Sequence, residues 1–143
     1  MLCYDTYVLG NLTCTYVFTD VGLVSFEPEA KATKWRPSAD WRRRLDDHFS
    51  GKSKLTDFDM AGTAFQKTVW RAIADIPRGE TRTYTELAQI VGKPKAARAV
   101  ASACAQNPLL FVIPCHRVVA KHGLGGYKYG TALKQQLLEQ ELC

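Results

Sequence analysis

The stretch that decides the fold covers residues 83–105 and reads TYTELAQIVGKPKAARAVASACA. Thr83 and Glu86 have the three-residue spacing of a capping box, which predicts that a helix begins at this point. The helix is expected to stop at Gly92, because glycine is the residue that most often ends a helix. Residues 96–105 predict a second helix. Two short helices joined by a tight turn predict a helix-turn-helix.

The predicted second helix carries small side chains. A recognition helix that contacts base edges in the major groove would have long polar side chains at these positions. Ala97 and Ala101 are four residues apart and therefore share a face, and Arg98 is the only long side chain between them. Readers of the major groove usually present Arg, Asn or Gln to base edges. A smooth face with one arginine suits close approach to a DNA backbone or to the narrow minor groove. Packing of the alanines against a neighbouring helix is the alternative interpretation.

Upstream of this stretch the pattern changes from helical to extended. Residues 4–27 are rich in β-branched and aromatic residues and contain turn signals, which predicts two or three antiparallel strands. Residues 38–50 predict a helix, with apolar side chains at a spacing of four. A polar linker follows and divides the chain into a small N-terminal domain of residues 1–60 and a C-terminal domain of residues 61–143. The predicted fold class is therefore α+β.

Length and charge narrow the class of function. A chain of 143 residues with 46% hydrophobic and 23% charged residues is globular and holds about one ordinary domain, or one domain plus a small appendage. Its apolar runs are far shorter than the roughly 20 residues of a membrane helix, and no secretory signal is visible, so a cytoplasmic or nuclear protein without membrane contact is expected. Residues 67–98 carry seven basic and three acidic residues. This surplus indicates an anionic partner, with nucleic acid the default candidate, although a solvated basic face explains it equally well.

The cysteine content argues against a disulfide framework and against a metal site. The chain has five cysteines, an odd number, which fits a reducing compartment. Structural zinc needs four grouped ligands, whereas Cys3, Cys14 and His48 offer at most three that are far apart in the sequence. No metal is therefore expected.

Residues 113–119 read IPCHRVV and carry the most informative chemistry. Cys115 stands beside His116 and follows an apolar run, residues 109–113, which predicts a strand. The thiolate is the nucleophilic form of cysteine, and a neighbouring imidazole or cation can lower the pKa of the thiol. A reactive cysteine is one interpretation of this pattern, and a buried structural cysteine is the other.

The last predicted helix supplies a possible partner for the histidine. Leu133, Leu137 and Glu141 are four residues apart and share one face. A carboxylate on a packing face is costly unless it is paired, and His116 is the obvious partner. Cys115, His116 and Glu141 would then be nucleophile, base and orienter, with a water bridge between thiol and imidazole. The alternative is that Glu141 frays into solvent near the end of the chain.

Taken together, residues 63–143 resemble the O6-alkylguanine-DNA alkyltransferases, which repair DNA by direct reversal. The motifs that carry the resemblance are Phe65-Gln66-x-x-Val69-Trp70, Gly79 through Tyr84, Pro94-Lys95-Ala96-Ala97-Arg98-Ala99-Val100, Asn107-Pro108, Ile113-Pro114-Cys115-His116-Arg117-Val118-Val119 and Gly125-Gly126-Tyr127. The first 62 residues are similar to the family in general pattern only. The resemblance implies a small ribonuclease-H-like antiparallel N-terminal domain and a mostly helical, winged-helix-like C-terminal domain that contains the helix-turn-helix.

The resemblance also implies a role for each residue that matches a motif. Cys115 would accept the alkyl group from guanine in one irreversible step. His116 would deprotonate the thiol through a water, and Glu141 would orient the imidazole. Asn107 would stabilise the active-site turn. Tyr84 would help to rotate the nucleotide out of the duplex and would donate a proton or hydrogen bond to the departing guanine.

For DNA contact, the resemblance implies that the small-residue helix docks in the minor groove. Lys95, Ala97 and Ala101 would lie against the duplex, and Arg98 would fill the gap left by the flipped base. The expected walls of the base pocket are Pro114, Val118, Gly126, Tyr127 and Tyr129. Residues 120–130 form a loop that looks one residue shorter than in many relatives. The residue that contacts the base oxygen is therefore left open among Gly126, Tyr127 and Tyr129.

The implied function is stoichiometric transfer of an alkyl group from O6 of guanine, and from O4 of thymine, in double-stranded DNA to Cys115. The protein would act as a monomer, after base flipping, without metal or cofactor. Three alternatives are a non-catalytic sensor of alkylated bases on the same fold, a DNA-binding regulator with a structural Cys115, and a cysteine hydrolase. Sensors of this type have the acceptor cysteine replaced, commonly by tryptophan, whereas Cys115 is present here.

Overall fold

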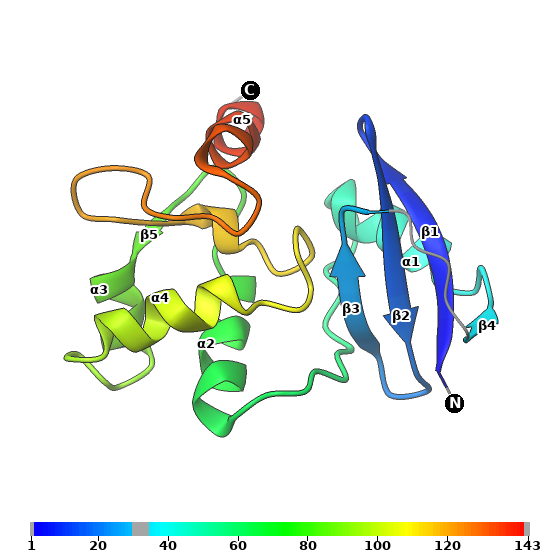
Figure 1. Ribbon diagram of the computed structural model, residues 1–143, viewed down its shortest axis with the longest axis horizontal. Helices are drawn as coiled ribbons and strands as arrows, with labels where there is room; N and C mark the ends of the chain where they lie inside the picture. Colours follow the sequence, from blue (N-terminus) through cyan, green and yellow to red (C-terminus); the bar gives the residue numbers. More distant parts are fainter. Residues whose placement is uncertain (1, 30–34, 142–143) are drawn as a thin grey trace. The chain divides into compact units, whose positions relative to one another are not determined.

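The computed structural model describes residues 2–29 and 35–141 and divides the chain into two compact units (Figure 1). The first unit comprises the residues up to Ala61 together with Pro108–Val112. The second comprises Gly62–Asn107 and the residues from Ile113 onward. Strands dominate the first unit and helices the second, so the α+β class is confirmed. None of the helices in the described ranges is long and apolar enough to cross a membrane.

The first unit is a four-stranded sheet in the order β3-β2-β1-β4. β1 (Cys3–Leu9) and β2 (Leu12–Phe18) form an antiparallel hairpin, and β3 (Leu23–Glu27) pairs antiparallel with β2. The sequence predicted two or three antiparallel strands, and three are present. β4 (Arg36–Pro37) is an addition that the sequence pattern did not predict, and it pairs parallel with β1.

Helix α1 (Arg42–Phe49) begins later than the predicted residues 38–50. Ser38 was the expected cap, but its hydroxyl accepts a hydrogen bond from the amide of Asp40 instead, at 3.4 Å. The residue in the cap position is Trp41, which makes no side-chain cap bond. The local turn at Ser38 therefore takes the place of the first predicted helical turn.

The predicted strand over residues 109–113 is wrong. These residues form only isolated bridges, such as Leu109 with Phe26, and the backbone of Phe26 is hydrogen-bonded to Pro108 and Leu110. Phe111 has a φ of 69°, in the left-handed region that breaks an extended strand. Pro108–Val112 therefore belongs to the first unit, although the sequence pattern assigned it to the C-terminal domain.

The second unit starts with one further helix, followed by the two helices that the sequence predicted. α2 (Ala64–Ala74) is capped by Thr63 and Gln66, and α3 (Tyr84–Ile90) by Thr83 and Glu86, each through a complete capping box. Gly92 ends the second of these helices with a φ of 78°. α4 (Ala97–Ala105) follows one residue later than predicted. α3 and α4 pack against each other and against α2, as in a helix-turn-helix with a supporting helix.

The face of α4 that packs is not the face with the spaced alanines. Val100 and Ala103 are fully buried, and the backbone carbonyl of Ala103 accepts a buried hydrogen bond of 2.8 Å from the indole of Trp70. Ala97 and Ala101 are only partly buried. Part of each of these two alanines is therefore exposed to solvent.

A pair of short parallel strands holds two segments of this unit together. β5 (Arg82–Thr83) pairs with β6 (Val118–Val119), so Arg82 lies opposite Val118. Tyr84 starts α3 directly after β5, and the 3-10 turn η1 (Cys115–Arg117) ends directly before β6. The pairing therefore holds the start of α3 close to the turn that carries the cysteine. α5 (Thr131–Glu141) is the last element.

The N-terminal cap of α3 is expected to contribute to the stability of the protein. Replacing Thr83 by Ala removes the hydroxyl that accepts the hydrogen bond of 3.1 Å from the Glu86 amide. We expect the free energy of unfolding in urea to fall by about 1 kcal/mol. Thr83→Ser keeps the oxygen and is the matched control, with little loss expected. Equal losses in the two variants would show that the cap bond contributes nothing.

Candidate active site

Cys115 lies at the start of η1 and is 4% exposed. The turn is held from two sides, because the Cys115 amide donates to the carbonyl of Ile113 at 2.8 Å and the side-chain amide of Asn107 donates to the same carbonyl at 2.9 Å. Asn107 also hydrogen-bonds the Cys115 sulfur. Asn107 is itself buried, so the side chain from the end of α4 fixes both the turn and the thiol.

Burial raises the pKa of the Cys115 thiol. The Asn107 hydrogen bond and the positive charges of Lys134 and Lys128 work in the opposite direction without overcoming burial. Cys115 therefore rests as a thiol. A reaction at this sulfur needs a base that removes the proton when the substrate is in place.

The neighbouring residues form a buried ion-pair network around Glu141. His116 Nε2 hydrogen-bonds one Glu141 oxygen, and Arg117 Nε donates to both oxygens at 3.1 and 2.7 Å. Arg117 also donates through Nη1 to the carbonyl of Ile76 at 2.7 Å, which ties the network to the segment after α2. Glu141 is 6% exposed and does not fray into solvent. The contact predicted between His116 and Glu141 is present.

The charge state of Glu141 follows from its partners. Burial raises the pKa of this carboxyl, but the hydrogen bonds and charges of His116 and Arg117 outweigh burial and hold the pKa below its usual range. A carboxylate that accepts from Nε2 fixes the imidazole tautomer, so Nδ1 is the nitrogen left to accept a proton. Nδ1 of His116 is buried and has no hydrogen-bond partner in the described part of the chain.

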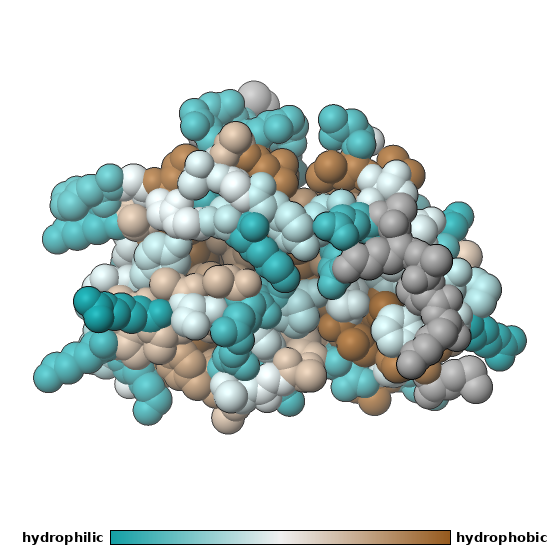
Figure 2. Space-filling view, in the orientation of Figure 1, coloured by the Kyte–Doolittle hydropathy of each residue, from teal (hydrophilic) through white to brown (hydrophobic). Residues whose placement is uncertain are grey.

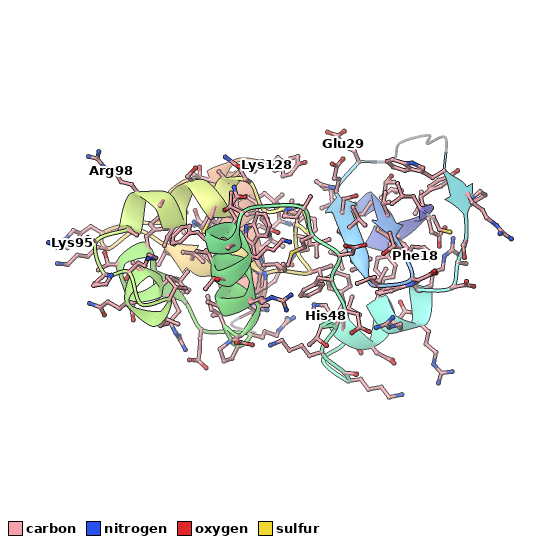
Figure 3. The ribbon with its side chains drawn as sticks, turned by 90° about the horizontal axis from the view of Figure 1, so that it is seen from below. Phe18, Glu29, His48, Lys95, Arg98 and Lys128 are labelled. Carbon is pink, nitrogen blue, oxygen red and sulfur yellow. The ribbon has the colours of Figure 1, made fainter. Side chains whose placement is uncertain are left out.

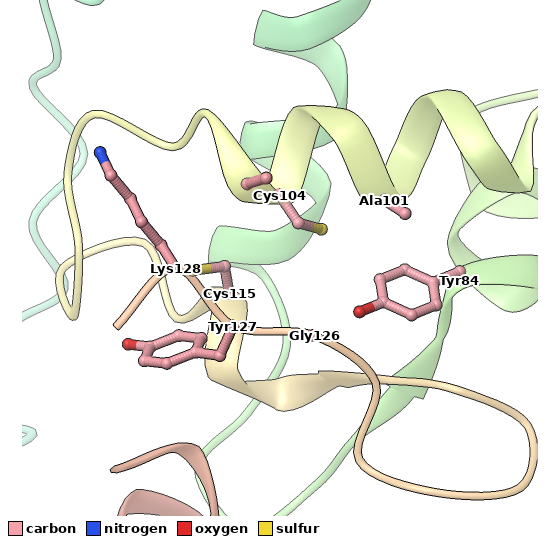
Figure 4. Close-up of a pocket in the computed structure, with 8 residues that line it drawn as sticks. Tyr84, Ala101, Cys104, Cys115, Gly126, Tyr127 and Lys128 are labelled. Atoms are coloured by element: carbon pink, nitrogen blue, oxygen red, sulfur yellow. The ribbon is translucent and has the colours of Figure 1, made fainter. Parts of the chain in front are cut away.

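A cavity of about 330 Å³ opens beside Cys115 (Figure 4). Its walls come from α3, α4, η1 and the loop before α5, through Tyr84, Ala101, Cys104, Ala105, Cys115, Gly126, Tyr127 and Lys128. Of the expected pocket residues, Gly126 and Tyr127 line this cavity. Pro114, Val118 and Tyr129 do not.

The position of Val118 has a clear physical cause. Its side chain is fully buried in the unit, and its carbonyl accepts a hydrogen bond of 2.6 Å from the ammonium of Lys134. Tyr84 lies in the cavity wall, and burial raises the pKa of its phenol. A protonated phenol that faces a cavity can donate a hydrogen bond to a bound molecule.

Sequence reasoning missed Lys134, the only fully buried lysine in the described residues. Its ammonium donates to the carbonyls of Val118 and of Gly126, the latter at 3.0 Å, and so joins β6 to the cavity loop. Burial lowers the pKa of Lys134. The spacing of the helix could have indicated that Lys134 is buried. Lys134, Leu138 and Glu141 are neighbours on one helix face, and that face packs.

Cys104 is a second thiol in the cavity wall that the pattern did not single out (Figure 4). Burial raises its pKa to about 12, so it is protonated at neutral pH. The structure gives it no imidazole partner comparable to the pair beside Cys115. Cys3, Cys14, Cys104 and Cys115 are free thiols, and no three His, Cys, Asp or Glu side chains within residues 2–29 and 35–141 could share a metal ion.

The predicted DNA-facing residues lie on the outside of the second unit. Lys95 and Arg98 are exposed, and Figure 3 shows both side chains projecting away from the helices. In the space-filling view, pale brown surface lies over α4 and hydrophilic side chains project around it (Figure 2). Small residues flanked by cations make a surface that can approach a polyanion closely.

Comparison with known proteins places the chain in a family. Residues 64–143 match the family of the 6-O-methylguanine DNA methyltransferase, DNA binding domain. The methylated-DNA–protein-cysteine methyltransferase of Mycobacterium leprae is 42% identical over 134 residues, which are 87% of this chain and 80% of that protein. The chain belongs to the O6-methylguanine DNA methyltransferase family. A probable methyltransferase of Acanthamoeba polyphaga mimivirus is 44% identical over 113 residues, 77% of this chain and 76% of the relative.

Similarity to solved methyltransferase structures extends over both units. The O6-methylguanine methyltransferase of Mycobacterium tuberculosis has a TM-score of 0.81 and 34% identity, and the match covers 99% of this chain and 93% of that one. A crystal structure of the same organism's OGT in complex with DNA gives a TM-score of 0.81 at 36% identity over 98% of this chain and 92% of that one. The first unit is therefore part of the family fold, although its sequence resembles the family only in general pattern.

The contribution of the buried Glu141 to the stability of the protein is expected to depend on pH. Its folded-state pKa lies below the ordinary 4.5, so the ion pair contributes its full stability above that value and loses it as the pH falls through the lowered pKa. Glu141→Gln removes the charge at every pH. We expect the variant to lose about 2 kcal/mol at neutral pH, because hydrogen bonds to a buried charge are lost.

The measurement is thermal unfolding of both proteins from neutral to acid pH. The gap between their midpoints is expected to shrink as the pH drops below 4.5. Glu139→Gln, an exposed carboxylate on the same helix, is the matched control. A gap that keeps its size through the acid range would contradict the ion pair.

Proposed function

We propose that this protein repairs DNA by moving an alkyl group from O6 of guanine to the sulfur of its own Cys115. The observation that carries the proposal is the position of Cys115, in the wall of a cavity and next to a histidine whose Nε2 is held by a buried carboxylate. Membership in the methyltransferase family supports it. O4 of thymine is a second oxygen of the same kind, and we propose it as a minor substrate.

The reaction balances with groups that the protein and the substrate supply. His116 takes the thiol proton at Nδ1, through a water. The sulfur of Cys115 then forms a bond to the alkyl carbon while the bond from that carbon to O6 breaks. The electron pair goes to the guanine, which takes one proton from the phenol of Tyr84, while His116 releases the proton it took and the phenolate regains one from solvent. The products are an alkylated cysteine and unmodified guanine, so no metal or cofactor takes part.

The location of the sulfur dictates how DNA presents the lesion. Cys115 is buried and faces a cavity, so an alkyl group stacked inside a duplex cannot reach it. The nucleotide has to leave the base stack, which costs a few kcal/mol. We propose that α4 lies in the minor groove with Ala97 and Ala101 against the duplex, that Lys95 contacts a phosphate, and that Arg98 fills the gap in the stack.

The binding partner is double-stranded DNA, in agreement with the DNA complex of the related Mycobacterium tuberculosis protein. We propose that one copy of the chain acts alone, because the cysteine, the base and the DNA-facing helix all come from one unit. The cellular compartment is then the one that holds the DNA, the cytoplasm or the nucleus.

The acceptor is tested by mass mapping. After incubation with a duplex that contains one O6-methylguanine, the peptide with Cys115 is expected to gain the mass of one methylene group. Cys115→Ser abolishes the gain. Cys104→Ser, a matched change in the same cavity wall, retains it. Methyl transfer by the Cys115→Ser variant would sink the proposal, and tight binding without a mass gain would identify a sensor.

Base flipping is tested at Arg98. Arg98→Ala is expected to slow transfer from duplex DNA at least about tenfold, because an unfilled gap makes extrusion more costly. Transfer from the free base O6-methylguanine does not involve flipping and is expected to keep its rate. Lys95→Ala is the control for simple loss of charge, and its defect is expected to vanish at low salt. If Arg98→Ala slows both substrates equally, the assignment fails.

A further inference from the structure

The second unit has another cavity, which shares no wall residue with the cavity beside Cys115. It is a groove of about 420 Å³, a size within the usual range of ligand pockets. Residues of α2, of β5 and of the end of α3 form its walls. The alkyl transfer proposed above does not use this groove.

The groove lies on the side of α2 that faces away from α4. Trp70 points toward α4, because its indole donates to the carbonyl of Ala103. Thr68 and Ala72, which line the groove, each stand two residues from Trp70, and two residues turn an α-helix by about 200°. They therefore lie on the opposite side of α2 from Trp70. A molecule bound along this side of α2 does not cover α4.

Half of the groove wall is apolar and comes from Ala72, Ile76, Ile90 and Val91. Ile76 is buried, whereas Ile90 is 60% exposed. No other large hydrophobic side chain among the described residues of the second unit is exposed. Covering Ile90 with another apolar side chain is favourable, because it removes apolar surface from water.

The charged part of the wall is mainly basic. Arg71 is exposed, and its guanidinium makes no ion pair within the described residues. Arg82 is positioned by a hydrogen bond of 2.9 Å to the carbonyl of Thr81, and its ion pair of 3.2 Å with Glu80 is open to solvent. Exposed ion pairs contribute little, so another carboxylate can replace Glu80 at small cost. Asp75 is the single acid of the wall and already interacts with another residue.

We propose that the groove binds a short segment of a partner protein in which large apolar residues stand beside Asp or Glu. The apolar side chains cover Ile90 and Ile76, and the carboxylates pair with Arg71 and Arg82. Helix α3 has seven residues and is therefore about 10 Å long, a length that three residues of an extended peptide span. A phosphate of DNA meets the same cations but leaves the apolar side chains uncovered.

The place of the groove suits attachment rather than catalysis. Because the groove and α4 lie on different sides of α2, a partner protein can hold this chain while DNA lies against α4. One groove residue also belongs to the ion-pair network, since the carbonyl of Ile76 accepts a hydrogen bond from Arg117. Arg71 and Ile90 have no such link and are therefore the positions to change.

The test selects ligands from a random library of seven-residue peptides displayed on phage. The natural chain and Arg71→Glu are used in parallel, and the peptides that bind only the natural chain are sequenced. We expect these peptides to combine Asp or Glu with Leu, Ile or Phe at adjacent or alternate positions. The strongest is synthesised with a fluorescent label, and its Kd is measured by fluorescence anisotropy.

Two variants of the groove and one matched control identify the site. Arg71→Glu and Ile90→Ser are each expected to raise the Kd of the peptide at least about tenfold, through loss of a charge-assisted hydrogen bond and of apolar contact. Arg98→Glu, the same charge reversal on α4, is expected to keep the Kd within about twofold, because salt screens distant charges. Urea unfolding shows that each variant is folded. Equal losses in Arg71→Glu and Arg98→Glu overturn the inference, since they indicate non-specific attraction to positive charge.

Duplex DNA distinguishes a protein site from a phosphate site. A saturating duplex is expected to leave the Kd of the peptide unchanged within about twofold, whereas competition assigns the groove to DNA and overturns the inference. Selected sequences without acidic residues, or no selected peptide at all, overturn it as well. The proposed function is judged separately by methyl transfer to Cys115, which can fail while the peptide result stands.

Discussion

The second unit depends on the ion pairs and hydrogen bonds that the Glu141 carboxylate makes. The carboxylate is buried at the end of α5 and is shared by His116 and Arg117 from η1. Arg117 continues the chain of contacts to the carbonyl of Ile76 after α2. One charge therefore joins three segments that are far apart in the sequence. A buried carboxylate without both partners would be expensive, so η1 strongly favours docking of the last turn of α5.

This requirement couples folding to chemistry. The contact that orders α5 is also the contact that fixes the tautomer of His116 and leaves Nδ1 as the proton acceptor. The same helix carries Lys134, whose ammonium joins β6 to the cavity loop. Once α5 has docked, the base beside the thiol and the wall of the cavity are set by one helix. Local pairing of β5 with β6 then places Tyr84 across from the cysteine.

Local chemistry explains which parts of the fold and site were predictable from the sequence. The cap at Thr83 and the stop at Gly92 depend on residues with fixed spacing. The contact of Glu141 with His116 depends on a charge that needs a partner. The insertion of Pro108–Val112 into the first unit depends on tertiary contacts with Phe26, which no local pattern encodes. Lys134 was missed because an isolated lysine on a helix normally reaches solvent.

In the proposed function, the burial of Cys115 makes the transfer to this sulfur run in one direction. A buried thiolate is an unfavourable charge, and burial accordingly raises the pKa of this thiol. The sulfur is thus unreactive until His116 has taken its proton. Alkyl transfer replaces that charge by a neutral thioether, which the buried site accommodates well. Reversal would need a neutral guanine to attack the alkyl carbon and expel the buried thiolate, which is the costly charged form. Burial therefore disfavours the thiolate before transfer and favours the neutral thioether after it.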